Sequence, residues 1–293
     1  REKMKKILLK DFLNNYMDNI TKEKKSSYFS SDECLRIIAK SLNKDKNYIY
    51  LHLNDIYLND SDIKNISSML KKRYIENIPL QYILGKQNFF KEEYMVNENV
   101  LIPRQDTEIL VETAIYYINK NKYVSLLDLC TGSGCVGISI ANNSNISKVD
   151  LVDISENALK VASKNICLND VKKDIKVILS DLFTKLNTNN KYDIIVSNPP
   201  YIKEKDLVKL SKEVKNEPIL ALAGGKSGTI FYKKILENAY GYLNKNGMII
   251  FEIGYDELED IKKIIAEYEH YTYINCIKDL GGNDRVVVIS FIG

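Results

Sequence analysis

The sequence predicts an α/β protein with a mostly parallel sheet, preceded by a small all-α domain and a β-hairpin connector. From about residue 105, apolar strand patterns alternate with helical ones, which favours a parallel sheet with helices on both faces. In the first 80 residues, apolar side chains recur at helical spacing instead. Between these regions, two aromatic segments flank the charged turn Lys91–Glu93. We therefore expect a helical bundle at residues 1–84, a hairpin linker at 85–103 and an α/β domain at 104–293.

The N-terminal domain should contain three main helices. The first carries apolar residues at helical spacing from Leu9 to Ile20. Ser30 and Glu33 fit a capping box that opens the second helix. Ser61 is placed to cap the third helix, and Pro79 is placed to end it.

The second domain should contain seven strands, with helices between most of them. The strands are expected at residues 124–129, 148–153, 175–179, 192–197, 248–252, 271–276 and 285–291. The helices are expected at residues 107–119, 135–142, 155–168, 228–244 and 256–268. The last two strands lack a clear helix between them, so they should form an antiparallel hairpin at one edge of the sheet, turning through Gly281–Gly282.

Composition and charge argue against several classes of protein. The net charge of +3 is too small to indicate a nucleic-acid-binding protein by itself. Its basic excess lies in residues 1–100, with 18 Lys/Arg and 14 Asp/Glu, and fits either solvated helix faces or a docking surface for an acidic or RNA-containing partner. The five Cys and two His lack the spacing of a metal site or a disulfide framework. No apolar run approaches the ~20 residues of a membrane span, and the first ten residues lack a signal-peptide core, so we expect a cytoplasmic protein.

A glycine-containing loop closes the first strand of the second domain and opens a helix. Glycines at such a junction let the backbone approach a ligand. Asp153 ends the next strand, where its carboxylate can accept hydrogen bonds from two ribose hydroxyls. Asp181 follows the third strand and could accept from an adenine amino group, with Leu182 or Phe183 against the ring. An adenosine-type ligand is therefore predicted, although GSGCVG at 132–137 also matches the NAD pattern GxGxxG. The candidate ligand-binding residues in the loop are Asp128, Cys130, Thr131, Gly132, Ser133 and Gly134.

The fourth strand runs into Asn198-Pro199-Pro200-Tyr201, at the edge where open α/β sheets bind ligands. Consecutive prolines restrict the backbone, so the Asn198 side-chain oxygen and the Pro199 carbonyl can form a rigid pair of acceptors for the two hydrogens of an NH₂ group. Tyr201 can lie against a flat amide or base. Because a conjugated planar nitrogen is a poor nucleophile, alignment and oriented dipoles would promote transfer to it without a strong base. The alternative interpretation is a rigid loop after a strand.

These motifs resemble the class I S-adenosylmethionine-dependent methyltransferases that act on amide or exocyclic amino nitrogens, which have a Rossmann-like, seven-stranded fold. Leu101–Glu108, Glu217–Pro218 with Ala221–Gly225, and Gly282–Val286 narrow the resemblance to the protein-(glutamine-N5) methyltransferases of peptide chain release factors, the HemK/PrmC family. The resemblance spans nearly the whole chain. It implies methyl transfer from S-adenosylmethionine, leaving S-adenosylhomocysteine, to the glutamine of a GGQ motif, with the helical domain docking the release factor.

The same resemblance implies roles for individual residues. Asn198 and Pro199 would hold the glutamine amide, with Asn198 also beside the cofactor. Arg104, Asp106 and Glu108 would border the active site. For Asp106, and for Thr107 beside it, the simpler interpretation is a helix N-cap.

Two positions depart from the family pattern. Cys130 stands where the loop usually has its first glycine, and a left-handed backbone would cost more there than for glycine, so we expect a backbone that suits a side chain. Leu182 stands where some relatives have an aromatic residue, which makes adenine stacking at this position doubtful.

Two other functions stay open. A nucleic-acid methyltransferase acting on adenine N6 or guanine N2 would need a basic, aromatic-rich groove, and a net charge of −1 over residues 101–293 argues against it. A non-catalytic protein-binding module would keep the fold without turnover. We expect a monomer with a release factor as its protein partner and no direct nucleic-acid or membrane partner.

Overall fold

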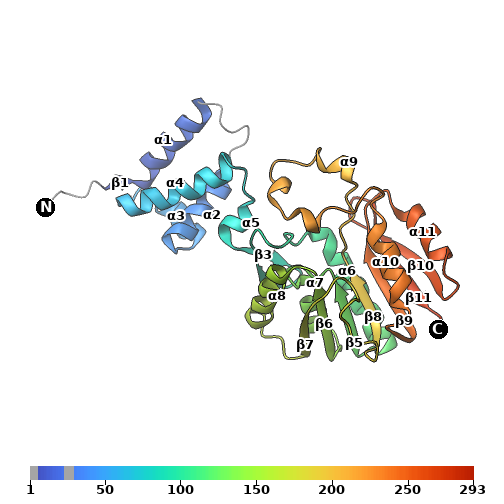
Figure 1. The fold of residues 1–293 in the computed structure, drawn as a ribbon. Coiled ribbons are helices and arrows are strands. Elements are labelled where there is room, and N and C mark those ends of the chain that lie inside the picture. Colours follow the sequence, from blue (N-terminus) through green and yellow to red (C-terminus); the bar gives the residue numbers. More distant parts are fainter. Residues whose placement is uncertain (1–5, 23–29) are drawn as a thin grey trace. The chain divides into compact units, whose positions relative to one another are not determined.

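The computed structural model describes residues 6–22 and 30–293 of the chain (Figure 1). It divides into two compact units. The smaller unit comprises Arg1–Gly85 and Lys212–Asn216, and the larger one comprises Lys86–Ser211 and Glu217–Gly293. The first is helical, whereas the second contains a sheet with helices on its faces. The hairpin between the two predicted domains groups with the larger unit.

The smaller unit is built from helices around one apolar core. Its helices are α1 (Leu9–Lys22), α2 (Ser31–Leu42), α3 (Lys46–Leu51), α4 (Asp60–Tyr74) and α5 (Leu80–Leu84). The three predicted helices correspond to α1, α2 and α4, while α3 and α5 are too short for a periodic pattern to reveal. The two-residue strands β1 (Ile7–Leu8) and β2 (Tyr57–Leu58) pair antiparallel. Fully buried core side chains include Leu9, Ile37, Ile38, Ile49, Leu58, Ile66 and Leu70.

The second helix, α2, has half of its predicted capping box. Ser30 accepts a hydrogen bond from the Glu33 N–H, as expected. Glu33, however, directs its two carboxylate oxygens to Arg73 on α4, at 2.7 and 3.0 Å. The carboxylate that should have completed the box instead forms an ion pair that joins α2 to α4.

The third predicted helix differs from expectation at both ends. Asn59 caps α4 in place of Ser61, because the Asn59 side chain accepts from the Asp62 N–H while Asp62 accepts from the Asn59 N–H. Ser61 lies one residue inside the helix, where its side chain is not needed as a cap. At the other end, α4 stops at Tyr74 and Pro79 precedes the first residue of α5. Asparagine is at least as good an N-cap as serine, which explains the choice of Asn59.

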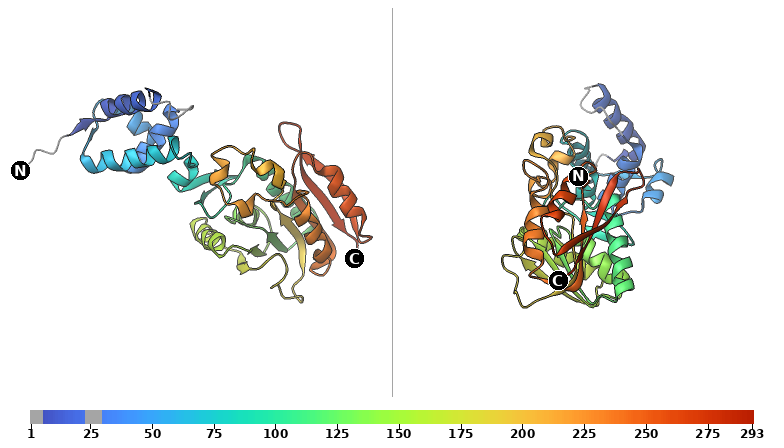
Figure 2. Two further views of the ribbon diagram at one scale, coloured as in Figure 1. Left: turned by 45° about the horizontal axis from the view of Figure 1, so that its top comes forward. Right: turned by 90° about the vertical axis from the view of Figure 1, so that its right-hand side faces the viewer.

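Within the described ranges, the larger unit has a seven-stranded sheet in the order β10-β11-β9-β8-β5-β6-β7. Its strands are β5 (Ser125–Leu129), β6 (Lys148–Asp153), β7 (Asp174–Leu179), β8 (Tyr192–Ser197), β9 (Leu243–Glu252), β10 (Tyr271–Lys278) and β11 (Asp284–Phe291). Strands β7, β6, β5, β8 and β9 run parallel, whereas β11 is antiparallel to both β9 and β10. Figure 2 shows the β10–β11 hairpin, in red, at one edge of the sheet. The predicted sheet and its edge hairpin are therefore confirmed.

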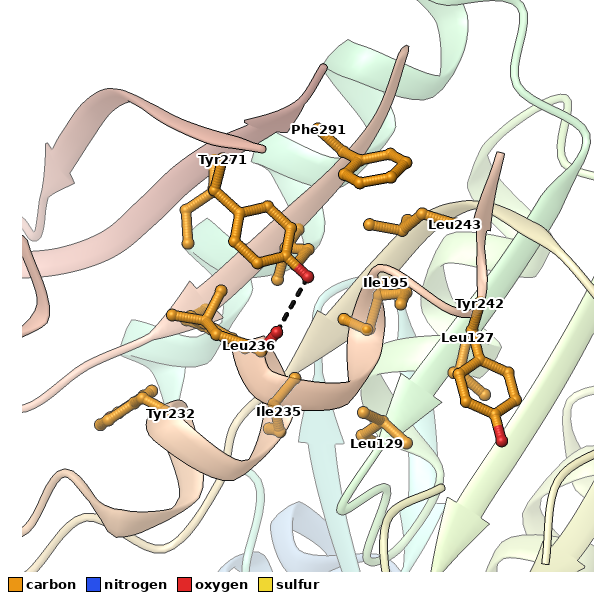
Figure 3. Close-up of a cluster of buried hydrophobic side chains, with 14 of the residues drawn as sticks. Leu127, Leu129, Ile195, Tyr232, Ile235, Leu236, Tyr242, Leu243, Tyr271 and Phe291 are labelled. Atoms are coloured by element: carbon orange, nitrogen blue, oxygen red, sulfur yellow. Dashed lines mark hydrogen bonds between the residues drawn. The ribbon is translucent and has the colours of Figure 1, made fainter. Parts of the chain in front are cut away.

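Helices cover both faces of this sheet. They are α6 (Glu108–Asn121), α7 (Cys135–Asn143), α8 (Glu156–Leu168), α10 (Ile230–Ala239) and α11 (Leu258–Ala266). The short helix α9 (Glu204–Leu207) lies in the loop after β8, and 3₁₀ turns lie at Gln105–Thr107 and Ile219–Ala221. Successive strand residues serve opposite faces: Val196 packs with residues of α6 and α7, and Ile195 with residues of α10 and α11. In the cluster that contains Ile195, the Tyr271 hydroxyl donates to the Leu236 carbonyl at 3.0 Å (Figure 3).

Helix α10 is shorter than the sequence predicts. It ends at Ala239, and β9 already begins at Leu243, five residues before the predicted strand. The Leu243 end of β9 pairs with Tyr192 of β8, so a tertiary hydrogen-bond partner converts predicted helix and loop into strand.

The connecting hairpin consists of β3 (Lys86–Phe89) and β4 (Glu92–Met95). Its turn is Phe90–Lys91, so the predicted turn at Lys91–Glu93 is wrong: Glu92 pairs with Phe89 inside the ladder. Tyr94 is fully buried, and its hydroxyl is 2.6 Å from the Ser139 hydroxyl of α7. The hairpin is thus packed on the helices beside the sheet.

The cap of α4 gives a first prediction. Asn59→Ala should destabilise the smaller unit by about 1 kcal/mol, because it leaves the Asp62 N–H in the first turn without its side-chain acceptor. Ser61→Ala is the matched control and should change stability by less than about 0.5 kcal/mol, since Ser61 is exposed. Urea unfolding followed through amide exchange in α4 measures both, and equal losses would contradict the cap assignment.

Candidate active site

A pocket lies at the carboxyl ends of β5, β6, β7 and β8, where the parallel-sheet rule places ligand sites. The predicted residues that line it are Arg104, Asp128, Cys130, Thr131, Gly132, Ser133, Asp153, Asp181, Leu182, Asn198 and Pro200. The predicted residues that do not line it are Asp106, Glu108, Gly134, Pro199 and Tyr201. Segments far apart in the sequence therefore form one concave surface.

Asp128 holds the glycine loop in shape. Its Oδ2 accepts hydrogen bonds from the Thr131 hydroxyl at 2.5 Å and from the Gly137 N–H at 3.0 Å. The side chain is buried, and burial raises the pKa of Asp128 to about 7. A Cβ on Gly137 would lie 2.3 Å from Leu151 Cδ2, so glycine there permits close packing of α7 on the sheet. Asp128 thus stabilises the glycine loop through hydrogen bonds, and it also lines the pocket.

The loop contains three left-handed residues: Cys130 at φ 59°, Gly132 at φ 56° and Gly134 at φ 82°. The expectation that Cys130 would adopt a backbone suited to a side chain is therefore wrong. The turn from β5 into α7 imposes the left-handed conformation, whichever residue occupies the position. Gly134 serves packing, since a Cβ there would meet Ile138 Cδ1 at 2.9 Å.

Asp153 contacts the loop and faces the pocket. Its Oδ2 accepts from the Gly132 N–H at 2.8 Å and its Oδ1 from the Ser155 N–H at 2.9 Å. Burial raises the pKa of Asp153, while these backbone bonds favour its charged form. Each carboxylate oxygen can accept a second hydrogen bond. Asp153 is therefore both a turn residue and a possible partner for two ligand hydroxyls.

The Ser180–Phe183 segment brings one apolar side chain to the pocket. Leu182 lines it, with a left-handed backbone at φ 48°. Phe183 is instead buried in the core, where its ring stacks on Tyr242 at a centroid distance of 4.8 Å. Of the two residues predicted to lie against an aromatic ring of the ligand, only Leu182 is in position.

Asn198 lies at the pocket, and Thr107 orients its carboxamide. The Asn198 Nδ2 donates to the Thr107 hydroxyl oxygen at 3.3 Å. Pro200 lines the pocket, while Pro199 is buried. Tyr201 is half-buried and packs against the core, with its hydroxyl 3.5 Å from Glu252 Oε1.

The loop after Pro200 is held by the Ala221–Gly225 segment. The Ile202 N–H donates to the Leu222 carbonyl at 3.0 Å, and the Gly224 N–H donates to the Ile202 carbonyl at 2.8 Å. A Cβ on Gly224 would lie 2.6 Å from the Tyr201 backbone, which explains the glycine. This backbone pairing fixes the position of Asn198 and the residues that follow it.

The segment before α6 is tied to the same loop. The Arg104 guanidinium forms an ion pair with Glu217, a buried carboxylate that also accepts from the Ile102 N–H at 3.0 Å. Asp106 lies 3.5 Å from Arg285 of β11, and Glu108 accepts from the Phe90 N–H at 2.9 Å. Of the three predicted substrate-side residues, Arg104 borders the pocket, while Asp106 and Glu108 hold neighbouring elements in place.

Comparison with known proteins relates this arrangement to a family. Residues 105–224 match the family model described as "Methyltransferase small domain". A release factor glutamine methyltransferase of Clostridium botulinum is 37% identical over 96% of this chain and 98% of that protein. The chain belongs to the release factor glutamine methyltransferase family. A relative of the same name from Fusobacterium nucleatum is 42% identical over 79% of this chain, which spans 65% of the length of that protein.

The fold of this methyltransferase family member also matches solved structures. A methyltransferase from Pyrococcus furiosus superposes with a TM-score of 0.52 at 21% identity, covering 68% of this chain and 88% of that one. The similarity confirms the class I methyltransferase fold, with its seven-stranded sheet.

Several pocket residues were given no individual role in the site from the sequence of this methyltransferase, although some lie in the segments that carry the family resemblance. They are Asn99, Val100, Leu101, Pro103, Thr107, Cys135, Val136, Val152, Ile154, Ser155, Ala158, Ser180, Pro218, Leu220, Ala221 and Phe231. Most are apolar or follow a strand end, and nothing in such residues separates them from ordinary core in a sequence. Thr107 was interpreted as a possible N-cap; it does occupy the N-cap position of α6, but its side chain makes no capping hydrogen bond.

The remaining expectations concern metals, cysteines and membranes. The described residues contain no group of three or more His, Cys, Asp or Glu able to hold a metal ion. All five cysteines lie in the described part of the methyltransferase and are free thiols. Among the helices of residues 6–22 and 30–293, none is long and apolar enough to cross a bilayer.

The strained loop of the methyltransferase gives a second prediction. Cys130→Gly should be about 0.5–1 kcal/mol more stable than Cys130→Ala, because both remove the thiol and only alanine keeps a Cβ at positive φ. Thermal unfolding of the two variants measures the difference. If the alanine variant were the more stable one, residue 130 would not have a left-handed backbone.

Proposed function

We propose that this chain transfers a methyl group from S-adenosylmethionine to the N5 side-chain amide nitrogen of the glutamine in the GGQ motif of peptide chain release factors. The main support is the pocket position of Asn198, with its Nδ2 held by Thr107, on the same concave surface as Asp153 and the glycine loop. Membership of the release factor glutamine methyltransferase family supports the substrate. The reaction would take place in the cytoplasm, with the enzyme as a monomer.

The hydrogen-bond acceptors and apolar side chains around the pocket fit S-adenosylmethionine. Asp153 has an acceptor position left on each oxygen for ribose hydroxyls, and Asp181 is placed after the next strand for the adenine amino group. Ile154, Ala158 and Leu182 offer apolar surface for the base. When bound, the cofactor supplies a methyl group made electrophilic by its sulfonium. Family membership favours this ligand over NAD.

The residues of the chain would then hold the acceptor nitrogen. The Asn198 carboxamide oxygen and the Pro199 carbonyl would each accept one hydrogen of the glutamine NH₂ group, which aligns the nitrogen and favours a localised lone pair. The buried proline pair keeps both acceptors rigid, so little reorganisation accompanies the reaction. Once methylated, the nitrogen is acidic and loses a proton readily, so this arrangement needs no strong base.

The smaller unit is proposed to dock the release factor. Its helix α3 and strand β2 carry large apolar side chains in solvent: Tyr50 is 63% exposed, Leu51 72% and Tyr57 60%. Exposed aromatic and aliphatic side chains are typical anchors of protein interfaces.

A transfer experiment tests the proposed function. Labelled S-adenosylmethionine, the full chain and a purified release factor should give a methylated GGQ glutamine, located by mass spectrometry. The GGQ→GGA release factor should take up no label, and DNA and RNA should remain unlabelled. Label on nucleic acid would favour a nucleic-acid methyltransferase, and no label on any substrate would favour a non-catalytic binding module.

Asn198→Ala should reduce the rate of glutamine methylation by ~10²-fold or more if Asn198 acts chiefly in the transition state.

The proposed cofactor site gives a further prediction. Asp153→Ala should weaken the calorimetric Kd for S-adenosylmethionine by about tenfold or more, since hydrogen bonds to a charged acceptor are lost. Asp174→Ala is the matched control, because Asp174 is exposed at the far end of the neighbouring strand β7. An unchanged Kd for Asp153→Ala would remove this residue from the cofactor site.

The proposed docking surface gives a prediction for binding of the release factor. Leu51→Ser should raise the KM for the release factor by roughly threefold or more, without changing the rate at saturation, because it removes an interface contact remote from the reaction. Leu280→Ser removes an even more exposed leucine from the β10–β11 turn and should leave both constants unchanged. An equal effect of the two variants would argue against docking on α3.

A further inference from the structure

A carboxylate interrupts the apolar pattern of β8 and β9 on one face of the sheet. In β8 and β9, Ile194 pairs with Met248 and Val196 with Ile250, and all four side chains belong to the cluster packed against α6. The register then pairs Ser197 with Phe251, so the next residues of the two strands are Asn198 and Glu252. Because side chains alternate along a strand, these two continue the apolar face. A glutamate thus stands where the pattern calls for a hydrophobic residue.

The burial of this carboxylate is costly. Glu252 is only 1% exposed, and among the described residues its Oε2 has no hydrogen-bond partner. Its Oε1 receives a long contact from the Tyr201 hydroxyl, at 3.5 Å. Burial raises the pKa of Glu252 to about 7, although a hydrogen bond from the Thr107 side chain and the charge of Arg285 oppose this rise. Replacing such a group by a neutral one is often neutral or stabilising, so stability alone does not account for a glutamate here.

Thr107 connects Glu252 to Asn198. The Thr107 side chain is 2% exposed, and its hydroxyl oxygen is 3.3 Å from Asn198 Nδ2. On its other side is the Glu252 carboxyl, whose pKa is lowered by its interaction with the Thr107 hydroxyl. A threonine hydroxyl has one hydrogen to donate, and an ionised carboxylate can only accept. The hydroxyl hydrogen therefore goes to Glu252, which leaves the Thr107 oxygen as an acceptor for the Asn198 NH₂ group.

The orientation of the Asn198 carboxamide follows from this chain of donors and acceptors. With Nδ2 held by Thr107, the carboxamide oxygen is left for the substrate. If the Asn198 carboxamide were rotated by half a turn, its own NH₂ would face the NH₂ of the acceptor glutamine. Two hydrogen-bond donors would then oppose each other, and the substrate would lose its acceptor. We propose that Glu252 and Thr107 are positioning residues that select the catalytically competent orientation of the Asn198 side chain. This inference rests on the role given to Asn198 in the proposed function.

Two substitutions separate positioning from simple packing. In Glu252→Gln, the new side-chain NH₂ can donate to Thr107, which frees the Thr107 hydroxyl to donate to the Asn198 oxygen and turn the carboxamide. Thr107→Val removes the hydroxyl at nearly constant volume, whereas Thr107→Ser keeps it. At pH 8, Glu252→Gln and Thr107→Val should each lower the single-turnover rate of glutamine methylation by about tenfold or more, and Thr107→Ser by less than about threefold.

Other readouts should stay constant. The calorimetric Kd for S-adenosylmethionine should stay within about twofold in all three variants, and the Tm of Glu252→Gln should not fall. In the double variant the rate should be no lower than in the slower single variant, because both changes break one series of hydrogen bonds. Additive rate losses, or a loss that Thr107→Ser shares with Thr107→Val, would overturn the proposal.

A measurement that does not depend on turnover distinguishes the positioning role of Glu252 from the proposed methyltransferase function. NMR of the full chain, with the Asn198 side-chain NH₂ signals assigned through Asn198→Asp, should show cross-relaxation from these protons to the Thr107 methyl group, and Glu252→Gln should weaken it severalfold. Unchanged cross-relaxation in Glu252→Gln would overturn the positioning role, whatever the rates. If the expected change were seen while the parent enzyme methylated no release factor, the proposed function would fail and the orientation by Glu252 would stand.

Discussion

Parallel pairing of β5 with β6 on one side and β8 on the other is the constraint on which the site depends. Leu129, the last residue of β5, pairs with Val152 and with Ser197. The residues that follow these three therefore leave the sheet at one level, and they are Cys130, Asp153 and Asn198. A loop, a carboxylate and a carboxamide from three parts of the chain meet because of a shared register. A slip of one residue in either pairing would turn these side chains to the opposite face.

Two buried carboxylates support this edge in different ways. Burial raises the pKa of Asp128 and of Glu252 to about 7 in both cases. Asp128 is satisfied by Thr131 and Gly137, so it stabilises the loop that it lies beneath. Glu252 is poorly satisfied, and its clearest connection leads through Thr107 to the pocket. A well-bonded buried acid indicates a structural role, whereas a poorly bonded one next to a reactive group points to function.

Two residues with a strained backbone conformation lie in the same place. Cys130 and Leu182 have left-handed backbones, and both line the pocket. Non-glycine residues in this conformation cost of order 1 kcal/mol or more, and they persist where the surrounding structure requires them. Here the tight turns that follow β5 and β7 require them, because the chain must leave the sheet sharply while keeping its backbone close to the pocket.

The sequence by itself determined the order of strands and helices along the chain, the antiparallel edge hairpin, and the glycine loop, Asp153 and Asn198 at the pocket. Apolar periodicity and glycine, proline and aspartate at strand ends are local signals, and local chemistry is enough to recognise them. Only the tertiary structure decided the orientation of Asn198, the diversion of Glu33 to Arg73, the extension of β9 to Leu243 and the left-handed backbone of Cys130. Each of these depends on a partner that is distant in the chain or on a turn imposed by neighbouring elements. Hydrogen bonds between residues 90 or more positions apart, such as that between Thr107 and Asn198, leave no periodic trace in the sequence.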